Sequence, residues 1–530
     1  MDSVSDSGVP IEGVAEDQVS LDAPRLLRRL SLDLRGTLPA EAALRAVAAD
    51  PSLVETYRDI YLEDPLFETR LIQLLAERWH TQVDEFQVGH FDYRLDDPQE
   101  YAFERAVGQE PLRLMAHIAA NDLPWTDIVT AEYTMANELL GELWPLERAE
   151  GEGWQPAYYT DGRSGGGVLG TNGLWWRYIT NTSNMNRGRA ATVTKLLLCH
   201  DILTRPVSFS GSSVGSGGVE EAIATEPACQ SCHATIDPLA ASLFGFYWLT
   251  QYNPFEQQRY HPERELLGSF YLGVEPAYFG TPVMGLEQLG QSIAADPRFY
   301  RCTAQTMAGL LWRREVSLDD FAQIERLRRE FINEGSELKP LIRAITDTMA
   351  YRVGALGEAA SMELEETALT RRMMVTDQLA SALYGVTGFS WTYEGFNQLD
   401  SDTLGYRVMG GAVDGDQVSS PQRDPGLTWA LVVKRAAQAA AAHVVSGDLT
   451  SGTEHPKLLK DVDADTRPAD PSFETQLISL HWRLLAIDPD AERLAALTDL
   501  WRQVYRASDS VSAWTVVVSS MLRDPEFVTY

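Results

Sequence analysis

The sequence predicts a mainly α-helical, multidomain protein with long irregular loops between its helical segments. The chain has 530 residues, whereas a single hydrophobic core stops growing at roughly 250–300 residues. Apolar side chains recur at i, i+3 and i+4 over much of the chain, which is the period of an amphipathic helix. Apolar residues make up 44% and charged residues 23% of the sequence, so the chain can bury substantial cores.

The helical pattern begins in residues 23–145, which form an expected N-terminal helical domain. This domain follows a flexible, acidic N-terminal segment at 1–22. Leucines at 26, 27, 30 and 34 share one helix face, and Pro39 marks a turn before the next run. Further helices are expected at 40–49, 52–63, 66–83, 98–107 and 109–120.

Residues 146–355 contain the most irregular stretches. The helical period disappears at 146–185, where the glycine-rich run DGRSGGGVLGTNG predicts a long ordered loop or a few short strands. A helix ending near Cys199 is followed by a Ser- and Gly-rich segment at 208–218. Helices are expected again at 285–295, 298–313, 318–334 and 338–350.

Residues 356–530 form an expected C-terminal helical domain. Helical runs are predicted at 362–384, 428–444, 472–486, 489–507 and 511–522. The stretch 386–425 is polar and rich in Gly and Asp, so it predicts loops with little regular structure.

One short motif carries specific chemistry. The run Ala228 to His233 reads ACQSCH, and C-x-x-C-H is the pattern of covalent haem attachment. In such a motif the two thiols add to the vinyl groups of haem, and the histidine ligates the iron. We therefore expect one covalent haem c on Cys229 and Cys232, with His233 as an axial ligand. The segment 146–355 is then a c-type haem-binding domain.

Three other readings of the same residues remain open. A thioredoxin-like redox pair needs a βαβ context, which the flanking sequence lacks. A zinc site needs further Cys or His ligands, and no second C-x-x-C or H-x-x-x-H is present. A disulfide between Cys229 and Cys232 leaves His233 unexplained.

The second axial position has several candidates. Met284 is the first, because it lies in a Pro- and Gly-punctuated loop about fifty residues after the motif. Met185, His200 and His261 are weaker alternatives, and water or an empty position is chemically available too. Arg187 and Arg189 are candidates to pair with the haem propionates, and surface salt bridges explain them equally well.

The remaining cysteines suggest a disulfide. The sequence has four cysteines, and the motif uses two of them, which leaves Cys199 and Cys302. In an oxidising compartment such a remaining pair favours a disulfide. Two separately buried thiols are the alternative.

Charge and hydropathy bound the partners and the location. A formal charge of −32 disfavours nucleic acid and anionic lipid as partners and suits a cationic redox protein, although solubility alone also explains it. No stretch is apolar enough to insert this chain into a membrane. Haem attachment to cysteines takes place outside the bacterial cytoplasm, so we expect a periplasmic, extracellular or cell-surface location. The N-terminus MDSVSDSGVP, which lacks an export signal, then reads as processed or engineered.

A weaker pattern suggests calcium. The run DSDTLG from Asp400 to Gly405, followed by Asp414, Gly415 and Asp416, is similar to calcium loops in which alternating acids ligate the ion. The twelfth position holds Gly411 where such loops carry Glu. A solvated acidic loop is therefore the favoured interpretation.

Several blocks of the chain, taken in order, resemble a family of secreted proteins. The blocks are LRRLSLDL from Leu27 to Leu34 with Pro39, IVTAEYTMANE from Ile128 to Glu138, Leu197 to Cys199, the haem motif with Ile236 to Leu239, Phe299 to Cys302, and SSMLRDPEF from Ser519 to Phe527. The family consists of large planctomycete and myxobacterial proteins with adjoining cytochrome-c-like domains of unknown function. The resemblance implies an exported, mainly helical protein with a cytochrome-c-like haem-binding region. The residues from Ala240 to Phe244 depart from the family pattern, as does the lack of an additional N-terminal cytochrome domain.

The expected function is single-electron transfer through one haem, either as a carrier or as a module of a larger redox complex. A peroxidase-like haem enzyme with an open iron position is one alternative. A surface binding or assembly protein with a structural haem is another. The sequence does not decide whether the chain is an enzyme, but it has no nucleophile elbow, Walker loop, dinucleotide fingerprint or zinc-protease motif.

Overall fold

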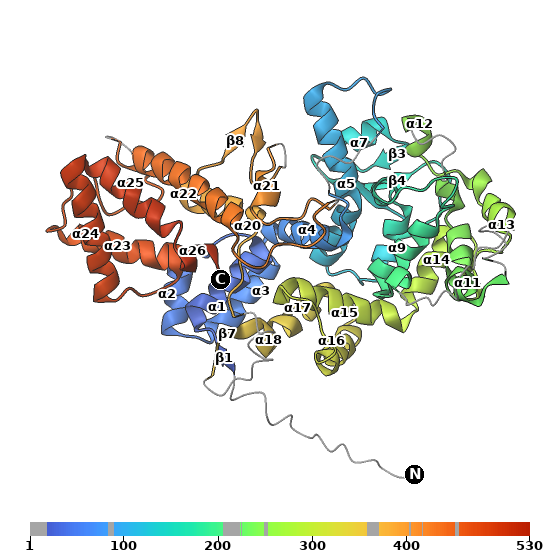
Figure 1. Cartoon of the computed structure of the whole chain (residues 1–530), viewed down its shortest axis with the longest axis horizontal. Helices are drawn as coiled ribbons and strands as arrows, with labels where there is room; N and C mark the ends of the chain where they lie inside the picture. The colour runs from blue at the N-terminus through green and yellow to red at the C-terminus, as the bar shows by residue number, and fades with distance from the viewer. Residues whose placement is uncertain are drawn as a thin grey trace, which may run out of the picture.

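The computed structural model shows a mainly helical chain with a few short strands (Figure 1). It describes residues 18–82, 89–204, 223, 225–247, 253–357, 370–401, 404–415, 417–450 and 455–530. The Ser- and Gly-rich run 208–218 and most of the N-terminal segment lie outside the described residues. None of the described helices is both long and apolar enough to cross a membrane.

The N-terminal helices begin and end at residues suited to those positions. They follow the short strand β1 (Gln18–Ser20) and comprise α1 (Ala23–Arg35), α2 (Glu41–Ala49), α3 (Leu53–Leu62), α4 (Pro65–Trp79) and α5 (Asp97–Ala120). The carboxylate of Asp22 accepts the Arg25 backbone N–H at 3.0 Å, which caps α1. Gly36 ends α1 in the left-handed conformation, with φ of 71°.

The expected helices 98–107 and 109–120 are one continuous helix, α5, which contains Pro111. Proline has no N–H to bond the carbonyl of Val107 four residues earlier. Gly173 packs at this point, where an added Cβ would lie 2.0 Å from the Val107 oxygen. Because Gly173 has no side chain, the helix that contains it, α8 (Asn172–Arg177), can approach α5 closely.

The stretch expected to be a loop or short strands contains both strands and helices. It follows α6 (Asp127–Thr130), β2 (Thr134–Ala136) and α7 (Glu138–Leu143), and it comprises β3 (Leu146–Arg148), β4 (Gln155–Tyr159), the 3₁₀ helix η1 (Gly167–Gly170) and α8 (Asn172–Arg177). The strands form an antiparallel sheet in the order β2-β4-β3, in which Thr134 faces Ala157 and Leu146 faces Tyr159. Trp175 and Trp176 of α8 are buried in the hydrophobic core.

Short helices and a hairpin follow, and they surround the haem motif. These are α9 (Arg187–Leu198), η2 (Ile202–Thr204), α11 (Pro227–Ala241), η3 (Phe244–Phe246), α12 (Pro254–Gln257), η4 (Pro262–Arg264), α13 (Leu267–Leu272), the β5 (Ala277–Tyr278) and β6 (Thr281–Pro282) hairpin, and α14 (Gly285–Ala294). Helix α11 packs against α9, α13 and β5. Figure 1 places this group at one end of the molecule.

The next elements return the chain towards α1. They are α15 (Pro297–Trp312), α16 (Phe321–Asn333), α17 (Leu338–Thr346), α18 (Met349–Arg352) and β7 (Val353–Leu356). Strand β7 pairs antiparallel with β1. The helices expected at 285–295, 298–313 and 318–334 are thus confirmed within a few residues at each end.

The C-terminal helices lie at the other end of the molecule (Figure 1). The elements here are α20 (Thr376–Thr387), the β8 (Thr392–Tyr393) and β9 (Phe396–Asn397) hairpin, α21 (Tyr406–Met409), α22 (Leu427–Asp448), α23 (Pro471–Leu480), the π-helical η5 (His481–Leu485), α24 (Ala491–Ala507), α25 (Ser510–Met521) and α26 (Pro525–Val528). The stretch 386–425 thus holds a hairpin and a short helix between its loops.

Two hydrophobic clusters meet at α1. The first runs through the described helices from α1 to α18 and crosses residue 145 without a break, and the second draws mainly on residues 373–530. Leu30 of α1 belongs to the first cluster and Leu32 to the second. The expected segment boundaries stay predictions, because a hydrophobic cluster does not by itself define a domain.

Buried charges also join α1 to the C-terminal segment. The guanidinium of Arg372 and the carboxylate of Asp33 form a fully buried ion pair at 2.9 Å. The Tyr530 hydroxyl donates to the same carboxylate at 2.6 Å. Arg28 donates to the backbone oxygens of Phe527 and Thr529 at 2.6 and 2.9 Å. Two of the blocks on which the family resemblance rests are therefore in direct contact.

Candidate haem site

The haem motif lies in the first half of α11. Pro227 occupies the first turn of this helix, where its missing N–H is harmless. Cys229, Cys232 and His233 are spaced i, i+3 and i+4, so they share one face of the helix. All three are partly exposed, whereas Ile236, Leu239 and Ala240 further along are buried. The motif thus stands at the exposed end of a helix whose other end is fixed in the core.

A buried carboxylate holds the histidine. The imidazole Nδ1 of His233 lies 3.0 Å from Oδ1 of Asp237, one helical turn later. Asp237 also accepts two hydrogen bonds from Arg187 at the start of α9, from Nε at 2.7 Å and from Nη2 at 3.1 Å. The carboxylate is buried, and the guanidinium compensates its charge. These three side chains tie α11 to α9.

This contact sets which ring nitrogen is available for a metal. A carboxylate acceptor at Nδ1 favours the tautomer that carries its proton on Nδ1. The lone pair is then on Nε2, which makes no hydrogen bond to any residue that the structure describes. Such a carboxylate partner is the usual second contact of a metal-ligating histidine, because it orients the ring and raises its basicity.

The two motif cysteines remain as thiols. Both Cys229 and Cys232 are free thiols, so the structure contains no disulfide between them. Their spacing along the helix places both on the face that carries His233. Within the described part of the chain, no three His, Cys, Asp or Glu side chains are grouped as a metal ion would require.

The side chain of Met284 is largely exposed to solvent. Met284 is the residue just before α14, and its side chain is 79% exposed. Helix α14 packs against α6 and η1. Its sulfur would have to leave solvent to bind iron, so the assignment of Met284 stays a prediction.

The weaker axial candidates differ in their surroundings. The ring nitrogens of His261 are both engaged, with Nδ1 at 3.1 Å from Glu263 and Nε2 at 3.0 Å from the Glu256 carbonyl. Met185 lies two residues before Arg187, on a segment that contacts α11 through Asp237. Its position makes Met185 the better placed of these two.

The arginines expected at the propionates have other partners. The guanidinium of Arg187 donates hydrogen bonds to both carboxylate oxygens of Asp237. Arg189 is fully buried and donates to the carbonyl oxygens of Tyr178, Phe246 and Trp175. Burial lowers the pKa of Arg189 to about 9. A surface salt bridge is therefore wrong for Arg189, which is buried between α8, α9 and η3. Its pairing with a haem propionate stays a prediction.

The first acid of the calcium-like pattern takes part in an ion pair. Asp400 forms an ion pair with Arg105 of α5 at 2.9 Å. Asp414 caps a turn by accepting the backbone N–H groups of Gln417 and Val418. Asp402, Thr403 and Asp416 lie outside the described residues. The favoured interpretation, an acidic loop, needs no calcium to account for these contacts.

The disulfide-forming pair lies at the end of α9 that is far from the haem motif. Cys199 and Cys302 are at bonding distance, with Cα atoms 5.1 Å apart across 103 residues. Cys199 immediately follows α9, and Cys302 is in α15. The bridge therefore fixes the far end of the helix whose first residue, Arg187, holds Asp237.

The sequence named Asp237 only as part of a family block and missed its contact with His233. The signal was present, because an acid four residues after a histidine in a helix lies on the same face. Its partner Arg187 is 50 residues away in the chain, so spacing alone could not reveal it. Comparisons with protein-family models, with curated proteins and with solved structures gave no match.

Proposed function

We propose that this chain is an exported c-type haem protein that passes single electrons through one haem attached at Cys229 and Cys232. The observation that carries the proposal is the contact of His233 with Asp237, a carboxylate that Arg187 also binds. It supplies the oriented, electron-rich imidazole that an iron ligand needs, in a motif whose two thiols are free.

The haem, when bound, supplies an iron centre that can gain and lose one electron. The protein's own residues fix the conditions for this. In the neutral ring, Nδ1–H of His233 donates to the Asp237 carboxylate, which leaves the lone pair on Nε2. Arg187 compensates the carboxylate charge, so the site carries little net charge of its own. Because α9 and α11 are held together here, the ring stays in place while charge changes beside it.

Export and kinship are parts of the same proposal. The Cys199 and Cys302 pair is compatible with an oxidising compartment. The kinship rests on the resemblance of several sequence blocks to secreted planctomycete and myxobacterial cytochrome-c-like proteins.

The decisive experiment is export of the chain in cells with the full cytochrome c assembly machinery. We expect a covalently bound haem that stays with the denatured protein and adds its mass to the chain. The double variant Cys229→Ala/Cys232→Ala should keep its helical circular dichroism and lose the covalent haem. A matched control, Cys199→Ala/Cys302→Ala, should retain the haem. A wild-type chain with no covalent haem after such maturation would refute the proposal.

One observation favours a haem enzyme as a second candidate. The side chain of Met284, the expected second ligand, is largely exposed, and an iron held by His233 alone would have an open position for a substrate. An oxidised spectrum that changes on adding cyanide, together with turnover of peroxide, would favour this candidate. A spectrum unaffected by cyanide would favour electron transfer.

A further inference from the structure

A large cleft lies between the N-terminal helices, the haem-motif helices and the C-terminal part of the chain. Its volume is about 640 Å³, within the range of small-molecule sites. Its walls come from the end of α4, from α8 and α9, from α15 and from residues 415 and 419–423. The lining residues come from all three expected helical segments, so no single segment forms the cleft.

The cleft reverses the charge balance of the protein. Its described lining has six Arg or Lys side chains and three Asp or Glu side chains, whereas the chain has 44 and 76. The cations are Arg78, Arg177, Lys195, Arg313, Arg314 and Arg423, and the acids are Glu77, Asp201 and Glu315.

Some of these cations are compensated by acids. Arg313 and Glu77 form a buried ion pair at 2.8 Å. Arg314 pairs with Asp320 at 2.7 Å, and Lys195 lies 3.4 Å from Asp201. These pairs shape the walls of the cleft and leave little charge for a ligand.

Two other arginines keep their charge available. Arg78 donates from Nη2 to the Lys195 carbonyl at 2.7 Å, and its Nε is buried without a hydrogen-bond partner among the described residues. A carbonyl does not cancel a full positive charge. Arg423 is exposed at the cleft and forms no ion pair with a described residue.

The arginines of the cleft also affect the pKa of His80. Its Nε2 lies 3.1 Å from the Ser419 carbonyl, at the wall of the cleft. Burial lowers the pKa of His80, and the charges of Arg177 and Arg78 lower it further. The imidazole is thus kept neutral beside cations that remain charged.

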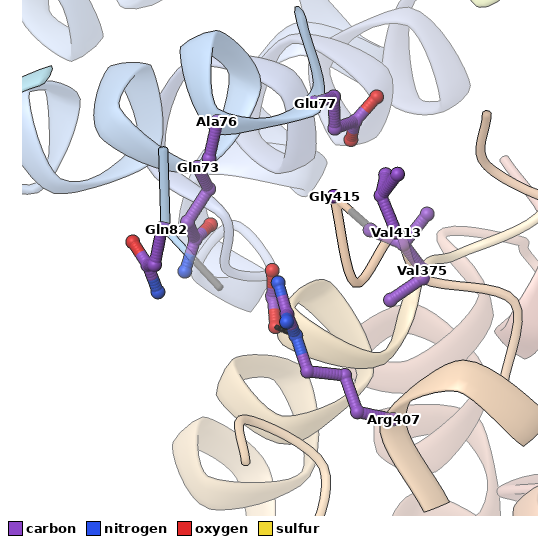
Figure 2. A pocket seen from close by; sticks show the side chains of 10 residues that line it. Gln73, Ala76, Glu77, Gln82, Val375, Arg407, Val413 and Gly415 are labelled. Carbon is purple, nitrogen blue, oxygen red and sulfur yellow. Dashed lines mark ion pairs between the residues drawn. The ribbon is translucent and has the colours of Figure 1, made fainter. Parts of the chain in front are cut away.

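A smaller pocket adjoins the cleft and shares Glu77 and Gly415 with it. Figure 2 shows Arg407 reaching from α21 towards the end of α4, where Gln73 lies across the pocket. Its volume of about 10 Å³ has room for roughly one water. A ligand would therefore occupy the cleft itself.

We propose that the cleft binds a small organic polyanion through carboxylate or phosphate oxygens. Arginine forks match both groups with paired hydrogen bonds. An anion could bind Arg78 and Arg423, neither of which forms an ion pair with a described acid. The proposal does not depend on the haem, although α9 takes part in both sites.

The test is isothermal titration calorimetry on the full chain at fixed ionic strength. The probes are citrate for carboxylates, pyrophosphate for phosphates and glycerol as a neutral control. We expect saturable binding of citrate, pyrophosphate or both, and none of glycerol. Binding of one anion and not the other would assign the class. The measurement uses heat, so its result is independent of whether haem is attached.

Variants separate a built site from non-specific attraction. Arg423→Ala should weaken binding about tenfold, since a hydrogen bond to a charged group contributes about 1.5 kcal/mol. Ser420→Glu places a negative charge on an exposed lining residue and should abolish binding. Arg506→Ala removes an exposed arginine of α24 and should bind as the wild type does. Thermal melting checks that each variant is folded.

Absence of saturable heat with both anions would overturn the proposal. So would equal weakening by Arg423→Ala and Arg506→Ala, because that result indicates attraction to overall charge alone.

Discussion

Asp237 and His233 lie one turn apart on α11, and the carboxylate oxygen of the first is 3.0 Å from the ring nitrogen of the second. Arg187 holds the same carboxylate from the neighbouring helix at 2.7 Å. If an iron binds at Nε2, the charge on Asp237 acts on it through the ring.

Replacement of this carboxylate should raise the reduction potential of the bound haem. Asp237→Asn removes a negative charge that stabilises the oxidised, more positive iron. Loss of a charged hydrogen bond of about 1.5 kcal/mol corresponds to about 60 mV for one electron. Arg187→Gln should shift the potential in the opposite direction, because it leaves the carboxylate uncompensated. Redox titration followed by absorbance measures both. Shifts of the same sign in the two variants would contradict the assigned contact.

The second axial ligand can be identified by paired methionine variants. We expect Met284→Leu to remove the red absorption band that marks a methionine bound to oxidised haem iron. Met185→Leu is the matched variant, on the segment that contacts α11. If the band disappears in Met185→Leu alone, Met284 is excluded. A wild-type protein without the band excludes both residues.

The Cys199 and Cys302 bridge should contribute strongly to stability. It closes a loop of 103 residues, for which the entropic model gives about 4.7 kcal/mol as an upper value. The double alanine variant should lose about 2–5 kcal/mol in urea unfolding. Wild-type protein in a thiol reductant is the control and should fall to the same stability. An unchanged midpoint in the variant would show that the bridge does not constrain the unfolded chain.

The buried ion pair of Asp33 and Arg372 should be costly to break. Asp33→Asn leaves Arg372 and its neighbour Arg29 without a compensating charge in the core. Removing one partner of a buried pair costs about 3–5 kcal/mol. Glu330→Gln breaks the half-exposed pair with Arg326 and should cost less than about 0.5 kcal/mol. Equal losses in the two variants would show that burial does not decide the effect.

The stability of the C-terminal part should depend on the protonation of Asp377. Burial raises the pKa of this carboxyl group to about 6, although Arg407 opposes the shift. The folded state therefore binds the proton more tightly than the unfolded state, whose pKa is about 3.9. The cost of the charged carboxylate is absent below about pH 4 and complete above about pH 6.

The variant Asp377→Asn tests this directly. A shift of about two pH units is equivalent to at most about 3 kcal/mol. The variant should be more stable than the wild type at pH 7.5, and the difference should vanish at pH 4. Urea unfolding at both pH values measures it. A variant that is less stable at pH 7.5 would show that the ion pair with Arg407 outweighs the burial.

The sequence predicted the helices well and the contacts between them poorly. The period of three to four residues located α14, α15 and α25, because their apolar faces are local features. It divided α5 between residues 107 and 109, where the structure has one continuous helix. It misplaced Arg189, because nothing local distinguishes a guanidinium that binds core carbonyls from one at the surface. The cleft was invisible for the same reason, since its walls come from segments hundreds of residues apart.

The joining of α1 to residues 527–530 has a consequence for biosynthesis. Arg28 and Asp33 are separated in the chain from their partners Phe527 and Tyr530 by 499 and 497 residues. Until those residues leave the ribosome, Arg28 and Asp33 lack the hydrogen-bond partners with which they are buried in the folded protein. The contacts of α1 with residues 527–530 can therefore form only after both segments have been synthesised.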